Sequence, residues 1–272
     1  MDPDPVRVLV ADRIPASTRT LLREHGWSWL DLRGHLHLAG PGLLVDADVQ
    51  TSPEAAEHKP AVYGNASVEV ACELMLDPDQ VASVRKLARQ LNRSPSTVSE
   101  ALARLRDHGL LTGEGKPLVP ELFWEIADHW KPPSFDLAKQ PDAQPAIAEA
   151  LRLGLDDPNS TGWAVTDTRA AAAYGAPVAV NSTYPPDFYV PDVRIARRAL
   201  HLLGGAITPS ARAARIRVAP TPSVCSHRYT KGTDEGFPLA HPLFVALDLA
   251  QDPVRGREVL EEWTPTGLRR VW

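Results

Sequence analysis

Residues 83–119 decide the fold, and they read SVRKLARQLNRSPSTVSEALARLRDHGLLTGEGKPLV. Apolar side chains recur here every three to four residues in two separate runs, which predicts two helices with one buried stripe each. The stripes consist of Val84, Leu87, Ala88 and Leu91, and of Val98, Ala101, Leu102 and Leu105.

The residues around these stripes predict where the helices begin and end. Ser94 suits an N-cap because its hydroxyl can accept from free backbone N–H groups, and Pro95 suits the first helical turn. Gly109 is typical of a residue just after a helix. Residues 110–112 and 117–119 can pair as two short strands around the tip at 113–116. Two helices followed by this strand pair predict a winged helix-turn-helix.

The outward faces of the two helices are candidates for contact with duplex DNA. In helix-turn-helix proteins the start of the second helix enters the major groove. There, hydroxyls can bind phosphates or bases, and arginine can bind guanine or phosphate. The candidate DNA-binding residues are Arg85, Lys86, Arg89, Arg93, Ser94, Ser96, Thr97, Glu100, Arg104 and Lys116. Winged helices also serve as protein-interaction modules, and this alternative stays open.

Residues 96–111 resemble the recognition helices of MarR- and GntR-like bacterial regulators, in which STVSxALxxLxxxGLL is a common form. The chain departs from that form at two points. Glu100 stands where a basic residue often follows the second serine, and it can accept from cytosine N4 or repel phosphate. The wing is short and has Lys116 as its one basic residue. Both departures bear on base specificity and leave the predicted fold unchanged.

Composition and charge limit the classes of protein to which the chain can belong. Its 272 residues are 43% hydrophobic and 23% charged, which excludes a fibrous or wholly disordered chain and fits about two domains. No apolar run approaches the ~20 residues of a membrane span. The N-terminus lacks the positive start of a secretory signal. Two cysteines cannot form a disulfide framework, so we expect a cytoplasmic protein without membrane contact.

The net charge of −5 conceals two basic segments. Residues 81–116 carry seven basic and three acidic side chains, and residues 192–231 carry eight and one. Such asymmetry points toward polyanion contact or toward solvated basic faces.

We expect an α/β protein with the winged helix at its centre. Residues 1–66 form a small β-α-β-β domain, with 50–66 as an irregular connector, and residues 67–130 form the winged helix. A Pro-rich linker covers 131–159, and a mixed α/β domain covers 160–272. Within that domain, 162–167, 176–180 and 215–220 are the expected strands.

Residues 191–203, PDVRIARRALHLL, predict a basic helix. Side chains three and four residues apart share one helix face. This face carries Arg194, Arg197, Arg198 and His201. Further downstream, Arg212, Arg215, Arg217, Arg228 and Lys231 extend the positive stretch. The helix can be an ordinary amphipathic surface helix, a second contact with the DNA backbone, or a site for an acidic partner or anionic ligand.

Both ends of the chain resemble AbiEi-type, type IV antitoxin-related actinobacterial regulators. The N-terminal match rests on Leu22, Gly26, Trp29, Leu30, Asp31, Gly34 and Leu36. The C-terminal match rests on Asp248, Leu249, Arg255 and Gly256. The resemblance implies a DNA-binding repressor, or an antitoxin whose partner is a nucleotidyltransferase-like toxin.

Catalytic patterns are incomplete. The N-terminal domain is similar to a degenerate PD-(D/E)xK nuclease core, but no Glu-x-Lys follows Asp31 to hold Mg²⁺. His35 and His37 share a strand face, as zinc ligands or as ordinary polar residues, with His25 or Asp31 as a conceivable third ligand. Asp46 and Asp48 lack the Gly-Ser loop of a nucleotidyltransferase. We therefore expect no enzyme and no cofactor.

The sequence predicts a transcriptional regulator that binds duplex DNA through a winged helix and that can form a homodimer. The alternative is an antitoxin or adaptor whose main target is a partner protein.

Overall fold

A computed structural model of the chain describes residues 6–11, 14, 16–32, 34–48, 62, 64–142, 144–157, 160–180, 184–234, 236–265 and 269–272, without the side chains of 16–17 and 230–234. Most of the connector expected at 50–66, and the side chain of Lys231, lie outside this description. The chain forms two compact units, unit 1 (residues 1–60) and unit 2 (residues 61–272).

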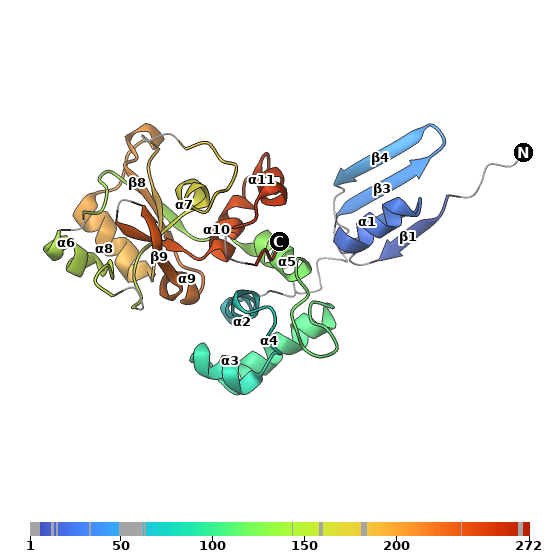
Figure 1. Cartoon of the computed structure of the whole chain (residues 1–272), viewed down its shortest axis with the longest axis horizontal. Helices are drawn as coiled ribbons and strands as arrows, with labels where there is room; N and C mark the ends of the chain where they lie inside the picture. Colours follow the sequence, from blue (N-terminus) through green and yellow to red (C-terminus); the bar gives the residue numbers. More distant parts are fainter. Residues whose placement is uncertain are drawn as a thin grey trace, which may run out of the picture. The chain divides into compact units, whose positions relative to one another are not determined.

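The described residues of unit 1 form one sheet and one helix. Its elements are β1 (Val8–Ala11), α1 (Ala16–Glu24), β2 (Ser28–Asp31), β3 (His35–Gly40) and β4 (Leu43–Asp48) (Figure 1). The strands lie in the order β1-β2-β3-β4, with β1 parallel to β2 and the other neighbours antiparallel. Gly42 in the β3–β4 turn has a φ of 76°, a conformation that favours glycine.

The first part of unit 2 has the helix order of a winged helix. It contains α2 (Asn65–Leu76), α3 (Val84–Gln90), α4 (Pro95–Asp107) and α5 (Glu121–His129). Between α4 and α5, Leu111 and Pro117 form an antiparallel bridge that closes the wing. The two predicted stripes lie inward: Leu87 and Ala88 of α3, and Val98, Ala101, Leu102 and Leu105 of α4, are buried.

Local geometry explains these boundaries. Ser94 caps α4 through a hydrogen bond that its hydroxyl accepts from the backbone N–H of Thr97, at 3.2 Å. Asn92, between α3 and α4, has a φ of 50°, which asparagine tolerates better than most residues. Gly109 follows α4 with a φ of 65°. The sequence therefore specified the ends of α4 through its cap and its stop.

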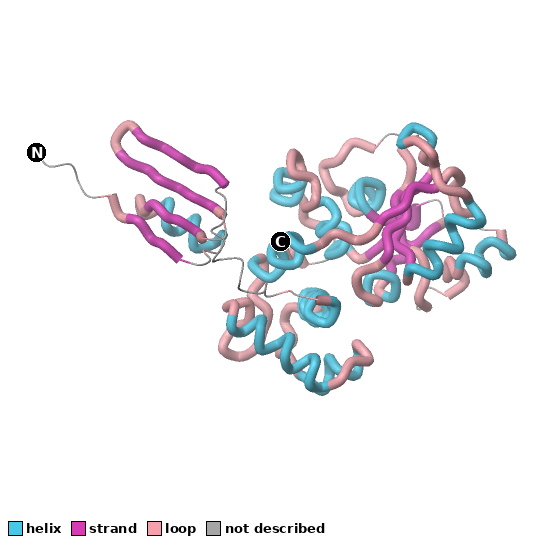
Figure 2. Tube along the Cα trace, turned by 180° about the vertical axis from the view of Figure 1, so that it is seen from behind, coloured by secondary structure: helices cyan, strands magenta, loops and turns pink. Residues whose placement is uncertain are grey.

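The rest of unit 2 is built on a six-stranded mixed sheet in the order β5-β8-β7-β6-β10-β9. The strands are β5 (Ser134–Leu137), β6 (Ala164–Thr166), β7 (Asp187–Val190), β8 (Ala214–Val218), β9 (Arg228–Asp234) and β10 (Phe237–Ala240). Helices lie on both sides of it (Figure 2). They are α6 (Pro145–Leu151), α7 (Asp167–Ala173), α8 (Val193–Leu203), α9 (Ser223–Ser226), α10 (Pro242–Leu249) and α11 (Gly256–Glu262), with a 3-10 turn at Pro209–Ala211.

This sheet differs from the sequence-based expectation in three ways. The segment expected as a linker, 131–159, contains the edge strand β5 and the helix α6. Residues 176–180, expected as a strand, form a turn and irregular backbone. The strands β7, β9 and β10 were not predicted. All four β7 residues are buried, so the strand lacks the alternation that marks a half-exposed strand.

The winged helix and the sheet share one core. The indole of Trp130, just after α5, donates hydrogen bonds to the hydroxyl of Tyr189 on β7 and to Asp248 on α10, both at 3.0 Å. The buried carboxylate of Glu73 on α2 accepts a hydrogen bond from Ser223 on α9. The two parts are therefore held together by buried polar contacts across a continuous apolar cluster. Among the described residues, no helix could cross a membrane.

Candidate nucleic-acid interface

The outer face of α3 carries the basic side chains that the sequence assigned to DNA. Arg85, Lys86 and Arg89 are all exposed. The Lys86 ammonium donates to the side-chain oxygen of Gln80, at 2.9 Å. Beside this face lies a hollow of about 690 Å³ that leads to the start of α4. The hollow is lined by Arg85, Ala88, Arg89, Asn92, Arg93 and Pro95.

The start of α4 presents a group of three hydroxyls. The Ser94 Oγ lies 2.8 Å from the hydroxyl oxygens of both Ser96 and Thr97. Ser94 is occupied as the helix cap, whereas Ser96 is exposed and can also contact a ligand. Helix N-termini attract phosphate because their N–H groups and dipole favour negative charge. This end of α4 is therefore suited to phosphate or to a groove edge.

Arg93 is less available than the sequence suggested. Its guanidinium forms two hydrogen bonds with the carboxylate of Glu69 on α2, each at 2.8 Å. Glu69 is 5% exposed. Hydrogen bonding to Glu69, together with its charge, raises the pKa of Arg93. The pair fixes the α3–α4 turn against α2, so Arg93 has a structural role in addition to any DNA contact.

The expected outward position of Arg104 is wrong. Its guanidinium points back to α2 and donates to the hydroxyl of Ser67, at 2.8 Å. Ser67 is fully buried, and the Arg104 Nε is itself buried and has no hydrogen-bond partner among the described residues. The exposed side chains of α4 are instead Pro95, Ser96, Ser99, Glu100, Ala103, Arg106 and Asp107. Arg106 and Ser99 are thus site candidates that the sequence reasoning missed.

The wing is a short hairpin held close to α3. The backbone N–H of Thr112 donates to the carbonyl of Lys116, at 2.8 Å. In return, the backbone N–H of Lys116 donates to the hydroxyl of Thr112, at 3.0 Å. The carbonyl of Gly115 accepts from the N–H of Ala82, at 2.9 Å. Lys116 is partly exposed beside the tip residues Gly113 and Glu114. The wing therefore offers one cation near the α3 face.

The comparison with family models agrees with this geometry. A model described as the iron dependent repressor, N-terminal DNA binding domain, matches residues 75–117. Residues 75–117 are a winged-helix DNA-binding domain. The match spans the end of α2, all of α3 and α4, and the wing, and it supports a DNA-binding regulator. The chain matches no curated protein and no solved structure.

The description of that model names iron, but the described residues of this chain form no set of iron ligands. Among the described residues, no group of three or more His, Cys, Asp or Glu side chains is placed to hold a metal ion. Cys72, within α2, is fully buried, and burial raises the pKa of its thiol well above the usual range.

The second basic face lies on α8. Arg194, Arg197, Arg198 and His201 are all exposed, as the sequence predicted. The opposite side of the helix is buried through Ile195, Ala196, Ala199 and Leu203. Val193, at the start of the helix, is 44% exposed. Asp192 caps the helix and accepts from the N–H groups of Arg194 and Ile195, at 2.7 and 3.0 Å.

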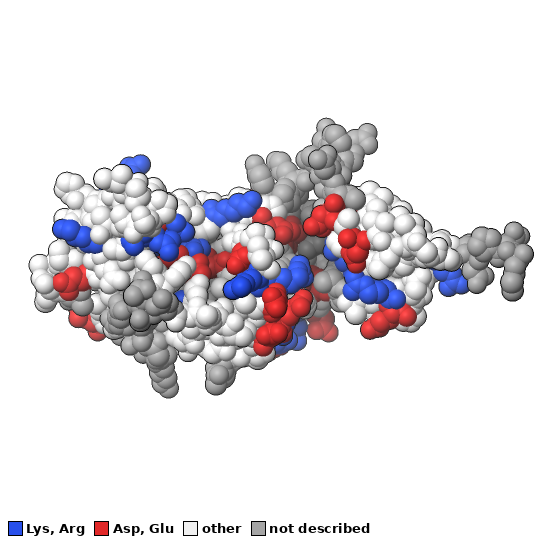
Figure 3. All heavy atoms as spheres, turned by 90° about the horizontal axis from the view of Figure 1, so that it is seen from above, with Lys and Arg blue, Asp and Glu red and all other residues white. Residues whose placement is uncertain are grey.

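The arginines downstream of α8 do not extend this positive surface. Arg212 and Arg215 pair with Asp136 on β5, at 4.0 and 2.7 Å. Arg228 donates to five backbone carbonyls, of Leu153, Gly154, Asp157, Ser160 and Trp163. On the part of the surface in Figure 3 that unit 2 forms, basic and acidic side chains are intermixed. Counting charges along the chain overestimated this basic segment.

Arg217 lies at the centre of a buried ionic cluster. Its guanidinium contacts Asp167, Asp187 at 2.6 Å and Asp248 at 3.2 Å. Burial raises the pKa of Asp248 to about 6, although the charge of Arg217 opposes this. Burial likewise raises the pKa of Asp187. Burial alone would lower the pKa of Arg217, but the three carboxylates raise it. The cluster joins α7, β7, β8 and α10, so its charges tie these elements together inside unit 2.

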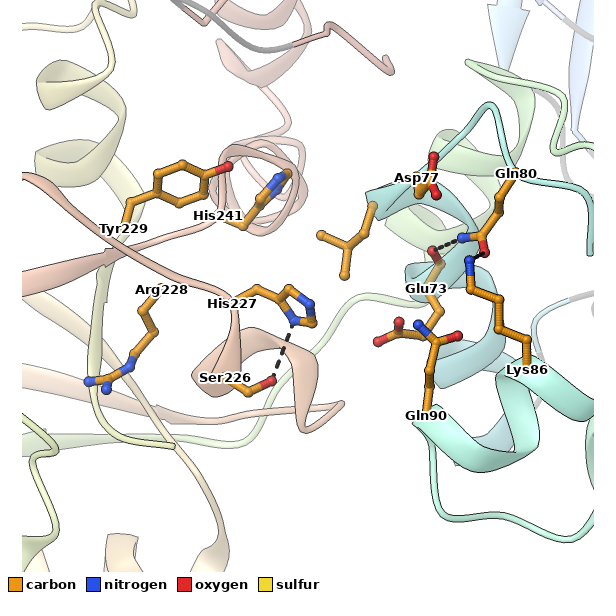
Figure 4. A pocket seen from close by; sticks show the side chains of 11 residues that line it. Glu73, Asp77, Gln80, Lys86, Gln90, Ser226, His227, Arg228, Tyr229 and His241 are labelled. Carbon is orange, nitrogen blue, oxygen red and sulfur yellow. Dashed lines mark hydrogen bonds between the residues drawn. The ribbon is translucent and has the colours of Figure 1, made fainter. Parts of the chain in front are cut away.

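A polar pocket of about 420 Å³ lies between α2–α3 and the β9–α10 region (Figure 4). Glu73, Gln80, Lys86 and Gln90 line it on the winged-helix side, and Ser226, His227, Tyr229 and His241 line the other. The Nδ1 of His241 accepts from the N–H of Leu243, at 3.1 Å, and so caps α10. Burial lowers the pKa of His241 to about 4. The ring is neutral at pH 7, and its Nε2 carries the proton.

In unit 1 the described residues bring neither His25 nor Asp31 together with His35 and His37 as a third zinc ligand. Asp31 is buried, and its carboxylate accepts from the N–H of Ile14 and from Arg19, at 3.0 and 2.5 Å. His35 and His37 both pair with Asp46, at 3.0 Å each. Partial burial would raise the pKa of Asp46, but the hydrogen bond from His37 and nearby positive charges lower it. These polar side chains therefore bind one another, or nearby backbone and arginine groups, beneath α1.

Proposed function

We propose that the protein is a transcriptional regulator that places α4 in the major groove of duplex DNA and holds the flanking backbone with α3 and the wing. The observation that supports this proposal most is the continuous exposed surface from Arg85 and Arg89, across the hollow, to the hydroxyl group at the start of α4. The family match over residues 75–117 supports the same assignment.

Fluorescence anisotropy with a labelled duplex from the region upstream of the gene tests the proposal at several salt concentrations. Removing one phosphate-binding side chain lowers the slope of log affinity against log salt by about 1. The double substitution Arg85→Ala, Arg89→Ala should therefore weaken binding to all duplexes and lower the slope by about 2. Arg255→Ala, at an exposed arginine far from α3 in the sequence, is the control. Absence of salt-sensitive duplex binding by the full chain would reject the proposal.

Base selectivity would come from the outward side chains of α4. Glu100 can accept from cytosine N4, and Arg106 can reach guanine or phosphate. Glu100→Gln should change the preferred sequence in a randomised-duplex selection, because it replaces an acceptor by an amide with both donor and acceptor. An unchanged preference would place Glu100 outside the base contacts.

The α8 face is our proposed second contact with the DNA backbone. Its three arginines are exposed and have no ion pair with a carboxylate among the described residues. The triple substitution Arg194→Ala, Arg197→Ala, Arg198→Ala should lower the salt slope without changing the preferred sequence. An unchanged slope would leave α8 as a surface helix.

The antitoxin alternative rests on resemblance at the two ends of the chain. In the structure the matching residues have structural roles: Asp248 belongs to the buried cluster, and Trp29 and Asp31 are buried in unit 1. The structural roles of these residues are compatible with a fold shared with the antitoxin-related regulators, and they do not identify a partner protein. Co-purification of the chain with the product of a neighbouring nucleotidyltransferase-like gene would support this alternative. We also expect no metal-dependent DNA cleavage by unit 1.

A further inference from the structure

The sheet of unit 1 has one polar face and one apolar face, and its helix covers the polar one. Register pairs place Trp29, His37 and Asp46 side by side on one face. Arg23 of α1 lies over the Trp29 ring and contacts Asp46, and Arg19 contacts Asp31. These contacts put α1 on the polar face.

The other face is made of uncharged side chains. The strand positions that alternate with Trp29 and its partners are Val8, Val10, Ser28, Leu30, Leu36, Leu38, Gly40, Leu43, Val45 and Ala47. Val8, Val10 and Leu43 are 44%, 58% and 56% exposed. Val6, which precedes β1 on the same side, is 49% exposed and approaches Gly40. An apolar sheet face is normally covered by another layer.

Unit 1 has little apolar core of its own. Among its described residues, Ile14 and Trp29 are the buried apolar side chains. The same unit contributes seven of the fourteen large apolar side chains that are exposed in the described chain, although it holds 60 of 272 residues. Domains of this size are marginally stable, so burial of the exposed apolar side chains would stabilise unit 1.

We propose that this apolar face is a dimer interface, on which a second copy of the chain packs the same face. A two-fold interface uses one patch twice, so the patch must be complementary to itself. An uncharged face of Val, Leu and Ala meets this requirement, because no like charges would be brought together. Two such sheets would stack ~10 Å apart, as in a β-sandwich.

Other segments of unit 1 are less suited to cover the face. After Val49, residues 50–61 carry Glu54, Glu57 and Lys59 and no large apolar side chain. Four strands of this length present roughly 350 Å² of flat area per copy. Two copies would therefore bury roughly 700 Å² in total, which is less than the ~1,200 Å² of a standard specific interface, so the dimer should be weak and should dissociate on dilution. The inference does not depend on DNA binding.

Sedimentation velocity of the full chain between 1 and 100 μM tests the proposal. The mass should rise from monomer to dimer across this range. Val10→Asp should keep the chain monomeric at every concentration, since the charge would be buried against its own copy. Leu44→Asp is the matched control: Leu44 is 72% exposed on the same sheet but on the opposite face. It should dimerise like the parent chain.

A second measurement keeps the test decisive if Val10→Asp folds poorly. The native cysteines, Cys72 and Cys225, are fully buried, so an introduced surface cysteine would be the reactive one. A short bis-maleimide should cross-link Val10→Cys into dimers and leave Leu44→Cys monomeric. A parent chain that stays monomeric at 100 μM, or equal cross-linking of the two variants, would overturn the proposal. If Val10→Asp changed the thermal stability but left the sedimenting mass as in the parent chain, the face would be assigned to a contact within one chain.

Discussion

The guanidinium of Arg104 on α4 donates to the buried hydroxyl of Ser67 on α2, at 2.8 Å. This contact assigns Arg104 to the interior of the winged helix. Arg104→Ala would leave a buried hydroxyl without its charged partner, a change worth about 1.5–3 kcal/mol. We expect urea unfolding to show a loss of that size, while DNA affinity per folded molecule changes less than about twofold.

Arg106→Ala is the matched substitution two residues away, where the side chain is exposed. It should change stability by less than about 0.5 kcal/mol and weaken DNA binding instead. If Arg104→Ala weakened binding and Arg106→Ala did not, the assignment of the two arginines would have to be exchanged.

Arg217 provides a second test, because its guanidinium neutralises three carboxylates at once. Arg217→Met should destabilise unit 2 by about 3–5 kcal/mol, since buried charges lose their partner. Arg215→Met, on the same strand, breaks a more exposed pair with Asp136 and should cost at most about 1 kcal/mol. Equal losses in chemical denaturation would contradict the buried role of Arg217.

The pH dependence of the Arg217→Met variant has a definite sign. The pKa values of Asp187 and Asp248 are already raised by burial, and loss of the cation would raise them further. Through these two carboxyls the folded state then binds more protons than the unfolded state, so the stability of the variant relative to the parent chain should increase as the pH falls from 7 toward 5. Unfolding experiments at the two pH values would show a smaller deficit at pH 5.

The winged helix was predictable because its information is local. The Ser94 cap, the Gly109 stop and the two apolar stripes lie within 27 residues of one another, and each has a direct structural cause. Arg104 was misplaced because it lies on a flank of α4, between the buried stripe and the outward side. Helical periodicity cannot show which flank meets α2.

The C-terminal sheet was less predictable because its contacts are long-range. β5 pairs with β8, some eighty residues later in the chain, and Asp136 on β5 neutralises Arg215. Charges that look like a basic segment in sequence therefore meet carboxylates from distant segments in the fold. The apolar face of unit 1 was hidden for a similar reason, since alternation along each strand was visible but the position of α1 was not.

Gly256 is one of the residues on which the C-terminal resemblance rests, and a substitution there tests whether its role is structural. A Cβ atom added there would lie 2.1 Å from the carbonyl oxygen of Leu249, which is backbone and cannot move aside easily. Gly256→Ala should therefore destabilise the chain by about 1–3 kcal/mol. Gly113→Ala is the control, because a Cβ at Gly113 would meet no atom within 4 Å. Thermal melts should separate the two variants, and equal melting temperatures would refute the steric argument.

His241 should make the fold sensitive to mild acid. Its pKa is about 4 in the folded chain, where burial and the nearby His227 disfavour the charged ring, against about 6.5 when unfolded. Between these values the unfolded state binds the extra proton, so the contribution of His241 to stability falls as the pH drops from 6.5 to 4, by on the order of 3 kcal/mol. The raised pKa of Asp248 contributes in the opposite direction over the same range. His241→Asn keeps a side-chain acceptor for the N–H of Leu243 but cannot titrate. Its unfolding free energy should lose most of this pH dependence, whereas His201→Asn on the exposed face of α8 should retain it. The same pH dependence in both variants would show that another group is responsible.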